Sequence, residues 1–372
     1  MLPLTNITAA RPAGVLLAVA IAVALTAVSS CTPRGADRAA TAELDGPAQE
    51  LATVGFYNLE NLFDVDDDPD NRGDEEWLPD AEKRWTPQRY QEKLARLAGV
   101  IAELGGEARP GGPALLGVCE VENARVLYDL IDQPPLANSG YEVVHFQSPD
   151  YRGIDCALLY RKDDYTVAAA RPLRVDLGTR DDGSARTTRD VLEVRGALRG
   201  DSLHVFVNHW PSRRGGEARS RPGREAAARV VRAAVDEMRV ADPDVDIAIV
   251  GDFNDDPVSP SIATTLRAGA RRGEAGQTGL YNPMVSLYRR GEGSLGYRDS
   301  WNLFDQIIVS EGLARAGEDW SLRNARVFRD ADLLQRSGRF RGYPLRTYVG
   351  DDYRAGYSDH LPVYAVLQRP VR

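Results

Sequence analysis

The sequence predicts a layered α/β protein in which β-sheets are covered by helices. Short apolar, β-rich segments recur along the chain after residue 50, and several are continuously apolar, as strands are when both faces of their sheet are covered. Two long segments between them carry apolar residues at helical spacing. Many strands with a few long helices between them favour sheets packed against helices.

Nine segments are expected to form strands. "LATVGFYNL" (51–59) and "VDIAIVGDF" (245–253) are apolar over most of their length, which is typical of buried strands. The other seven are residues 114–121, 141–146, 154–161, 191–198, 203–210, 304–310 and 360–367. No repeat of fixed period connects them, so we expect one large α/β domain rather than a repeat protein.

Two helices are expected between the strands. Thr86 can cap the first, and Pro87 stands at the first helical position, where its missing N–H is tolerated. The apolar residues that follow at helical spacing are Tyr90, Leu94, Leu97, Ile101 and Leu104. The second helix is expected from about Arg224 to Arg239, and its inward face comprises Ala227, Val230, Val231, Ala234, Val235 and Met238.

The N-terminus has the features of an export signal. Arg11 precedes the apolar segment "AGVLLAVAIAVALTAV" (13–28), which is shorter than the roughly 20 residues of a membrane-spanning helix. The sequence "VSSC", which ends at Cys31, resembles a bacterial lipobox and implies that Cys31 is lipidated. An ordinary cleaved signal with an incidental cysteine is the alternative.

These features divide the chain into a signal peptide (1–30), a flexible polar linker (31–50) and a folded domain (51–372). We expect a bacterial protein that is exported and held by lipid at the cell envelope, on its outer face or periplasmic side. No feature indicates a protein partner, and we expect a monomer. Cys119 and Cys156 lie in apolar segments and are expected to be small buried residues rather than a disulfide.

The chain is acidic, with a formal net charge of −9, which disfavours a broad nucleic-acid-binding surface. Two segments nevertheless concentrate arginine. "HWPSRRGGEARSRPGRE" (209–225) contains five arginines close to a histidine. "RSGRFRGYPLRTY" (336–348) mixes four arginines with three aromatic residues, a composition that suits stacked bases or sugars with phosphates but also an ordinary arginine-rich flap.

Polar residues repeatedly stand where an apolar strand segment ends or begins. They are Asn58, Glu120, His209, Asp252, Asn254, Asp359 and His360. Segments distant in sequence can bring such residues to one edge of a sheet, which is how α/β enzymes build active sites. Carboxylate and amide oxygens suit a hard cation such as Mg²⁺ or Mn²⁺, and with two histidines and a spare carboxylate they could hydrolyse a phosphate ester.

In their order and joint presence these segments resemble the deoxyribonuclease I-like endonuclease/exonuclease/phosphatase superfamily. The matching segments are "FYNLENLFD", "GVCEVEN", "RGIDCALLYR", "VNHWPSRRGG", "VGDFNDDP", "FDQIIVS" and "YSDHLPVYAVL". The resemblance implies that residues 51–372 form a four-layered α/β sandwich of two packed sheets flanked by helices, with the active site at one end of the sheets. It also implies a metal-dependent phosphoric ester hydrolase.

The resemblance further implies catalytic roles. Asp252 is similar to the family's water-positioning aspartate, and Asn254 to its phosphate-contacting asparagine. His360 resembles the catalytic histidine and Asp305 its orienting carboxylate, which would raise the pKa of the imidazole. His209 resembles a second histidine of the deoxyribonuclease and phosphatase branches.

A metal site is implied in the same way. Asn58 and Glu120 look like its asparagine and glutamate, and Asp359 like a further ligand, direct or through water, so that Mg²⁺ or Mn²⁺ is the expected cofactor. Glu60 is a possible further metal or supporting group. Asp155 is a possible orienting partner of the second histidine.

The loop after the second histidine is expected to bind the substrate, because arginines there can clamp a phosphate. The candidate residues are Trp210, Ser212, Arg213 and Arg214. Three functions remain open: a surface-tethered nuclease for DNA or RNA, a phosphatase or phosphodiesterase for phosphoinositides, phospholipid headgroups or a small phosphoester, and a non-catalytic binding module. The complete set of site residues argues against the third.

Overall fold

The computed structural model describes residues 48–371, apart from Asp70 and residues 276–278. The predicted signal peptide, the lipidation site Cys31 and nearly all of the predicted linker lie outside the described residues. Among the helices that are described, none combines the length and the apolar character needed to cross a membrane.

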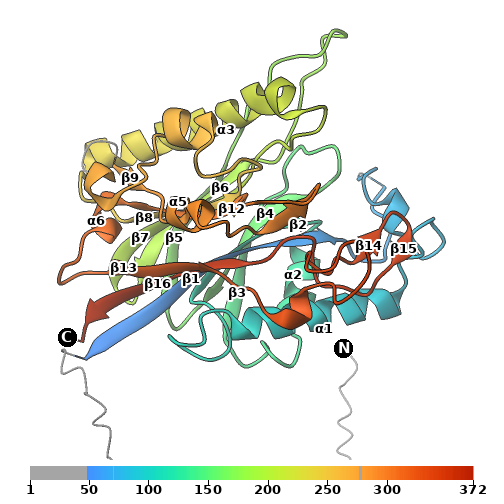
Figure 1. Ribbon diagram of the computed structural model, residues 1–372, viewed down its shortest axis with the longest axis horizontal. Helices are drawn as coiled ribbons and strands as arrows, with labels where there is room; N and C mark the ends of the chain where they lie inside the picture. The colour runs from blue at the N-terminus through green and yellow to red at the C-terminus, as the bar shows by residue number, and fades with distance from the viewer. Residues whose placement is uncertain (1–47, 70, 276–278, 372) are drawn as a thin grey trace, which may run out of the picture. The chain divides into compact units, whose positions relative to one another are not determined.

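Two mixed sheets of six strands each form the centre of the protein (Figure 1). The first sheet has the strand order β13 (Ser321–Val327), β16 (Val363–Pro370), β1 (Gln49–Leu62), β2 (Leu115–Val121), β4 (Asp155–Arg161) and β3 (Tyr141–His145). The second has the order β5 (Tyr165–Leu173), β6 (Val191–Leu198), β7 (Asp201–His209), β8 (Ile247–Asp252), β12 (Asp305–Ser310) and β9 (Leu280–Tyr281). Each sheet contains one parallel pair, β1 with β2 and β7 with β8, among antiparallel neighbours.

Helices cover the outer faces of both sheets. Helix α1 (Pro87–Glu103) and the shorter helix α2 (Ala124–Ile131) pack on the first sheet, and the long helix α3 (Glu217–Ala241) packs on the second (Figure 1). The other helical segments given for the described residues are η1 (Glu75–Trp77), η2 (Ser261–Leu266), η3 (Arg272–Glu274), α5 (Met284–Arg289), α6 (Glu311–Ala314) and η4 (Ala331–Leu333). The order helices, sheet, sheet, helix confirms the four-layered sandwich.

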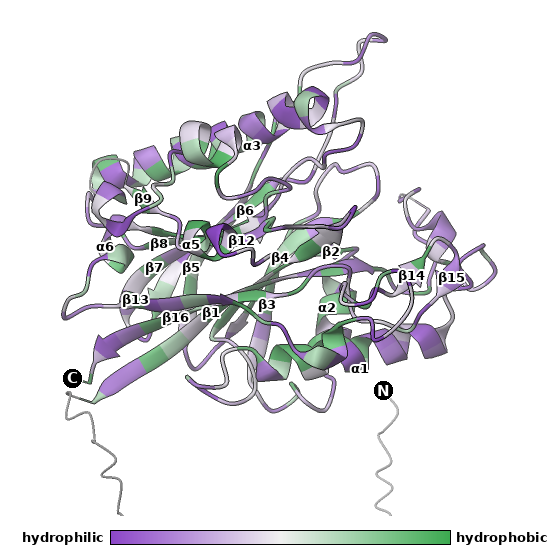
Figure 2. Cartoon of the chain, viewed as in Figure 1, coloured by the Kyte–Doolittle hydropathy of each residue, from purple (hydrophilic) through white to green (hydrophobic). Residues whose placement is uncertain are grey.

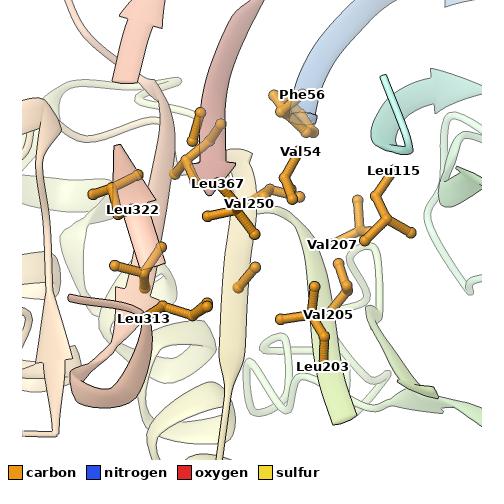
Figure 3. Packing of buried hydrophobic residues seen from close by; sticks show 14 of the residues in the cluster. Val54, Phe56, Leu115, Leu203, Val205, Val207, Val250, Leu313, Leu322 and Leu367 are labelled. Carbon is orange, nitrogen blue, oxygen red and sulfur yellow. The ribbon is translucent and has the colours of Figure 1, made fainter. Parts of the chain in front are cut away.

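The main core lies between the two sheets (Figure 3). Strand β8 illustrates how it forms, because Val250 points between the sheets while Ile249, its neighbour, packs on α3. Val54 and Leu115 of the first sheet meet Val205 and other apolar residues of the second. Hydrophilic residues gather on the outer faces of α1 and α3 (Figure 2). The continuously apolar strand segments are therefore explained by strands that are covered on both faces.

All nine expected strands are present, as β1, β2, β3, β4, β6, β7, β8, β12 and β16. The strands β5 and β13 were not expected, because they lie at sheet edges, are only partly buried and interrupt their apolar residues with polar ones. The two-residue strand β9 was not expected either, and two short hairpins, β10 (Leu295–Tyr297) with β11 (Ser300–Asn302) and β14 (Tyr348–Val349) with β15 (Asp352–Tyr353), complete the described strands. Cys119 and Cys156 are buried and free, as predicted.

Helix α1 begins as predicted, and Thr86 Oγ1 accepts a hydrogen bond from the amide of Arg89. The expected start of the second helix is wrong, because α3 begins at Glu217 rather than near Arg224 and includes Pro222. The buried guanidinium of Arg224 pairs with Asp255 at 2.7 Å and donates to Ser220 Oγ, which ties this first part of the helix to the protein. Much of the arginine-rich segment is therefore helical.

Candidate active site

Three predicted site residues lie side by side at one edge of the second sheet. His209 ends β7, Asp252 ends β8 and Asp305 begins β12. Asp252 is the register partner of both His209 and Asp305. Because β7 and β8 run parallel and β12 runs antiparallel to them, two strand ends and one strand start meet at the same edge.

The first sheet contributes Asn58 and Glu120 from the adjoining parallel strands β1 and β2. The Nδ2 atom of Asn58 donates to Asp252 Oδ2 at 3.2 Å, and this hydrogen bond joins the two sheets. His209 Nε2 lies 3.7 Å from Glu120 Oε1 and 3.6 Å from Asp252 Oδ2. The polar ends of both sheets therefore converge on one buried centre.

His360 forms a short hydrogen-bonded pair with Asp305, with Nδ1 2.7 Å from Oδ2. Both side chains are buried, and His360 Nε2 lies 3.9 Å from Asp252 Oδ2. Burial disfavours the charged imidazolium, but the carboxylates of Asp305 and Asp252 outweigh it and hold the pKa of His360 well above its usual value. Asp305, the predicted orienting carboxylate, therefore bonds Nδ1 of His360, while the other ring nitrogen, Nε2, is the one near Asp252.

Asp252 is poised to exchange a proton near neutral pH. Burial raises the pKa of its carboxyl to about 7, with His360 opposing and Asp305 reinforcing the shift. Its Oδ1 atom accepts a hydrogen bond from the amide of Asn254 at 2.9 Å. A carboxylate with these properties can position and deprotonate a water molecule.

The pair of Glu120 and Arg152 was not anticipated from the sequence. Arg152 Nη2 lies 3.1 Å from Glu120 Oε1 and 2.9 Å from Asn61 Oδ1. Burial would raise the pKa of Glu120, but the guanidinium of Arg152 outweighs it through its charge and its hydrogen bond and holds that pKa well below its usual range. Glu120 is therefore a largely enclosed carboxylate that remains ionised.

His209 is neutral at physiological pH, because burial and the charge of Arg189 hold its pKa well below the usual value. Its Nδ1 atom is buried and has no hydrogen-bond partner among the described residues. The suggestion that Asp155 orients His209 is wrong, because Asp155 instead lies 2.9 Å from His145 Nε2 and accepts from the amide of Ser148. Strand β4 carries that aspartate towards β3 rather than towards the site.

The residues present fit a hard divalent cation. Asn58, Glu120 and Asp359 offer oxygen atoms, and Glu120 is ionised although only 12% of its side chain is exposed. Asp252, Asp305 and His360 also bring one ligand atom each within 4.8 Å of the others. The short bond between His360 and Asp305 already engages that second group, so the oxygen set is the better candidate for Mg²⁺ or Mn²⁺.

Glu60 anchors a buried network behind these ligands. Its carboxylate accepts from Arg346 at 3.1 Å and from the amide of Thr347 at 2.6 Å. Arg346 also donates to Asp359 at 3.0 Å, and the buried Lys93 ammonium donates to the backbone carbonyl of Glu60. Glu60 is thus linked to the candidate ligand Asp359 through Arg346, which donates to both, and it acts as a supporting group.

Several site residues have the left-handed backbone conformation, which is unfavourable for residues other than glycine. The φ angles are 48° at Glu60, 52° at Asn61, 59° at Glu120 and 50° at Asn254. Strained conformations of this kind persist only where the surrounding structure imposes them, and they gather at functional sites. No sequence pattern indicates them, because none of these residues is glycine.

The structure separates the four predicted substrate-binding residues. Trp210 lies in the core with its ring against Phe253, and Arg213 is held by Asp255 at 3.0 Å and Asp256 at 3.2 Å. The buried Trp210 side chain cannot contact a substrate, which corrects that expectation, while the partly exposed Arg213 is paired within the protein and its role in binding stays a prediction. Ser212 and Arg214, in contrast, line an open cavity.

That cavity is a groove of about 740 Å³ beside the site, and six arginines line it. Arg152 and Arg189 are fixed by ion pairs with Glu120 and Asp150. The others are Arg186, Arg214, Arg219 and Arg229, which are exposed. Since Arg152 contacts Glu120, the arginine groove begins at the candidate metal site.

Comparison with known proteins gives matches to one family and to structures that share the fold. A model of the Endonuclease/Exonuclease/phosphatase family matches residues 53–369. One similar solved structure is that of humanized D. rerio TDP2, with 14% identity, a TM-score of 0.50 and a match over 86% of this chain and 99% of that chain. Another is a family protein from Bacteroides thetaiotaomicron, with 16% identity, a TM-score of 0.51 and a match over 87% of this chain and 97% of that chain. A mannosyl-6-phosphatase from Bacteroides thetaiotaomicron is also similar, with 16% identity, a TM-score of 0.50 and a match over 85% of this chain and 99% of that chain. At these identities the structures establish the fold alone, and no curated protein matches the sequence.

Proposed function

The chain belongs to the endonuclease/exonuclease/phosphatase family, and from this membership we propose that it is a divalent-metal-dependent phosphodiesterase that cleaves nucleic acid. The observation that carries the proposal is the buried centre at the ends of both sheets. There Asp252 lies next to the pair His360–Asp305, and His209 lies within 4 Å of both Asp252 and the ionised Glu120. A non-catalytic binding module would not require this set of perturbed, converging groups.

In the proposed reaction, Asp252 positions a water molecule and accepts its proton as the water attacks the phosphorus atom. The ester P–O bond opposite the attacking water breaks, and the leaving oxygen takes a proton from the solvent. Asn58 fixes this carboxylate through Oδ2, and the amide of Asn254 fixes it through Oδ1. His360 is held as an imidazolium by Asp305 and stabilises the charge that develops on the phosphoryl oxygens. Neutral His209, whose Nε2 lies 3.6 Å from Asp252 Oδ2, can donate a further hydrogen bond.

A cation held by Asn58, Glu120 and Asp359 would supply electrostatic stabilisation of the phosphate charge. Arg346 and Glu60 keep Asp359 in place for this role. Arg152 contacts Oε1 of Glu120, and the amide of Asn61 donates to its Oε2 at 3.1 Å, so both contacts fix the orientation of this carboxylate.

The arginine groove supports a polymeric substrate over a small phosphoester. Arg186, Arg219 and Arg229 form no ion pair with any other described residue, so their charges are available to a ligand. A row of exposed guanidinium groups that starts at the reaction centre suits successive phosphates of a nucleic-acid strand. A substrate with one phosphate would leave most of this groove unused.

The substrate is identified by a panel of plasmid DNA, single-stranded DNA, RNA, phosphoinositide, sphingomyelin and bis(p-nitrophenyl) phosphate, each with Mg²⁺, Mn²⁺ or EDTA. We expect cleavage of nucleic acid and of bis(p-nitrophenyl) phosphate with either metal, and loss of both activities in EDTA. Turnover of lipid headgroups without any cleavage of nucleic acid would refute the nuclease.

An internal control comes from the arginine groove. Arg186→Ala combined with Arg229→Ala should raise KM for nucleic acid and reduce its salt dependence, while hydrolysis of bis(p-nitrophenyl) phosphate is unchanged. Equal effects on both substrates would show that these arginines support the fold instead.

We also propose that the protein is exported and attached to the cell envelope through lipidated Cys31, as the lipobox resemblance implies. Cys31→Ser should move the protein from the membrane fraction to the soluble fraction of cells that express it. Unchanged fractionation of this variant would contradict the lipid anchor.

A further inference from the structure

We propose that a second cavity, beside the catalytic histidine, binds the base of a nucleotide adjoining the scissile phosphate; this rests on the nuclease function proposed above. The base cavity has a volume of about 430 Å³ and lies between the hairpin β10–β11 and residues 335–349. Arg346 and Asp359 form part of its lining. Since Asp359 is also a candidate metal ligand, the cavity adjoins the reaction centre.

The hairpin is attached directly to the backbone of the catalytic pair. Leu295 forms an isolated backbone bridge with His360, and the amide of Leu361 donates to the carbonyl of Ser294 at 2.8 Å. Ser294 Oγ accepts from the amide of Asp305 at 3.2 Å. A group bound against this hairpin therefore has a fixed position relative to the reacting phosphate.

One wall of the base cavity is an anchored aromatic ring. The hydroxyl of Tyr343 accepts from the amide of Asp299 at 2.6 Å and donates to the carboxylate of the same residue at 3.2 Å. A Cβ atom on Gly296 would lie 2.9 Å from a ring carbon of Tyr343, so glycine is what lets the ring approach the hairpin. The wall is rigid before a ligand binds, which lowers the entropic cost of binding.

The rim of the cavity exposes two further aromatic rings. Tyr297 is 57% exposed and Phe340 is 39% exposed, although both are large and apolar. A guanidinium group lies over each, with Arg298 5.2 Å from the Tyr297 ring centre and Arg339 5.5 Å from that of Phe340. Exposed aromatic residues beside a reaction centre indicate a ligand that covers them.

A nucleobase fits these walls better than a lipid chain does. Bases stack on aromatic rings and on guanidinium planes, and every base offers the flat face that such stacking requires. The lining also contains Asp299 and Gln335, whose polar atoms can form hydrogen bonds with the polar edge of a base. An acyl chain would bury these atoms without offering them a hydrogen-bond partner, which is unfavourable.

The proposal is tested with a single-stranded DNA in which a tetrahydrofuran residue, which has no base, replaces each nucleotide in turn. For the wild-type protein we expect the bond on one fixed side of this residue to be cleaved about 5- to 150-fold more slowly. The Phe340→Ala and Tyr297→Ala variants should cleave intact DNA at that reduced rate and should no longer respond to the missing base.

Tyr128→Ala is the matched control, because Tyr128 is an exposed tyrosine of α2 outside the cavity. This variant should keep the wild-type pattern. Wild-type cleavage that ignores the missing base, or Phe340→Ala protein that keeps the full response, would overturn the base cavity while leaving the nuclease intact.

A different result would separate the two proposals. If bis(p-nitrophenyl) phosphate is hydrolysed but no oligonucleotide is cleaved, the nuclease fails and the base assignment fails with it. If Phe340→Ala and Tyr297→Ala then slow the hydrolysis of phosphatidylinositol 4-phosphate in vesicles, the cavity binds a lipid substrate.

Discussion

Asp252→Asn is expected to lower kcat for the hydrolysis of bis(p-nitrophenyl) phosphate by roughly 10²–10⁴-fold, the usual contribution of a positioned general base. The amide keeps the shape of the carboxylate and can still accept from the amide of Asn254, so the loop after β8 should be preserved. It cannot accept a proton from water. The measurement is steady-state kinetics in Mg²⁺ together with a thermal unfolding curve.

Asp246→Asn is the control for this substitution. Asp246 directly precedes the same strand β8 at its far end, and burial likewise raises the pKa of its carboxyl to about 7. The two variants therefore make the same chemical change to similarly perturbed carboxyls. If Asp246→Asn lowers kcat as much as Asp252→Asn, or if Asp252→Asn keeps its activity, the proposed role of Asp252 is wrong.

Asp305→Asn is expected to lower kcat by roughly 10²–10⁴-fold and to change the pH dependence of what remains. The carboxylate fixes the ring of His360 through Nδ1 and is the largest favourable influence on its charged form. In the wild-type protein the pKa of His360 lies above its usual value, so the imidazolium is present at neutral pH and is lost only as the pH rises through that raised pKa.

Removal of the Asp305 charge leaves burial, which disfavours the imidazolium and lowers the pKa of His360. The alkaline limb of the kcat profile should therefore move to lower pH in Asp305→Asn. Asp155→Asn is the matched control, because it removes the carboxylate partner of a different histidine, His145, at 2.9 Å. An alkaline limb that is unchanged in Asp305→Asn, or one that moves equally in Asp155→Asn, would refute the assignment.

The fold was predictable because its strands are buried on both faces. The apolar segment of β8 sends Val250 into the layer between the sheets and Ile249 against α3, so neither face can be polar. The edge strands β5 and β13 were missed for the converse reason, since one covered face leaves room for polar residues that weaken the pattern. The early start of α3 was missed because Pro222 and the glycines before it suggest a loop.

The roles of the arginines depended on contacts between distant segments. Arg213 stands beside Arg214 in the sequence, yet Asp255 and Asp256 hold the first while the second lines the groove. Arg152 reaches Glu120 from a loop before β4, and nothing in its own neighbourhood indicates this. Composition located the positive charge correctly but could not tell which charges are already neutralised.

The sequence by itself determined the family, the layered fold and the chemical types at the strand ends, because burial restricts which residues a covered strand can carry and leaves polar ones at its ends. Only the tertiary structure decided how these groups act. Strand register set Asp252 beside His209 and Asp305, and the contact between sheets joined Asn58 to it. Distances of a few ångströms between residues far apart in the chain fix the protonation states of the site, and such distances exist only once the chain is folded.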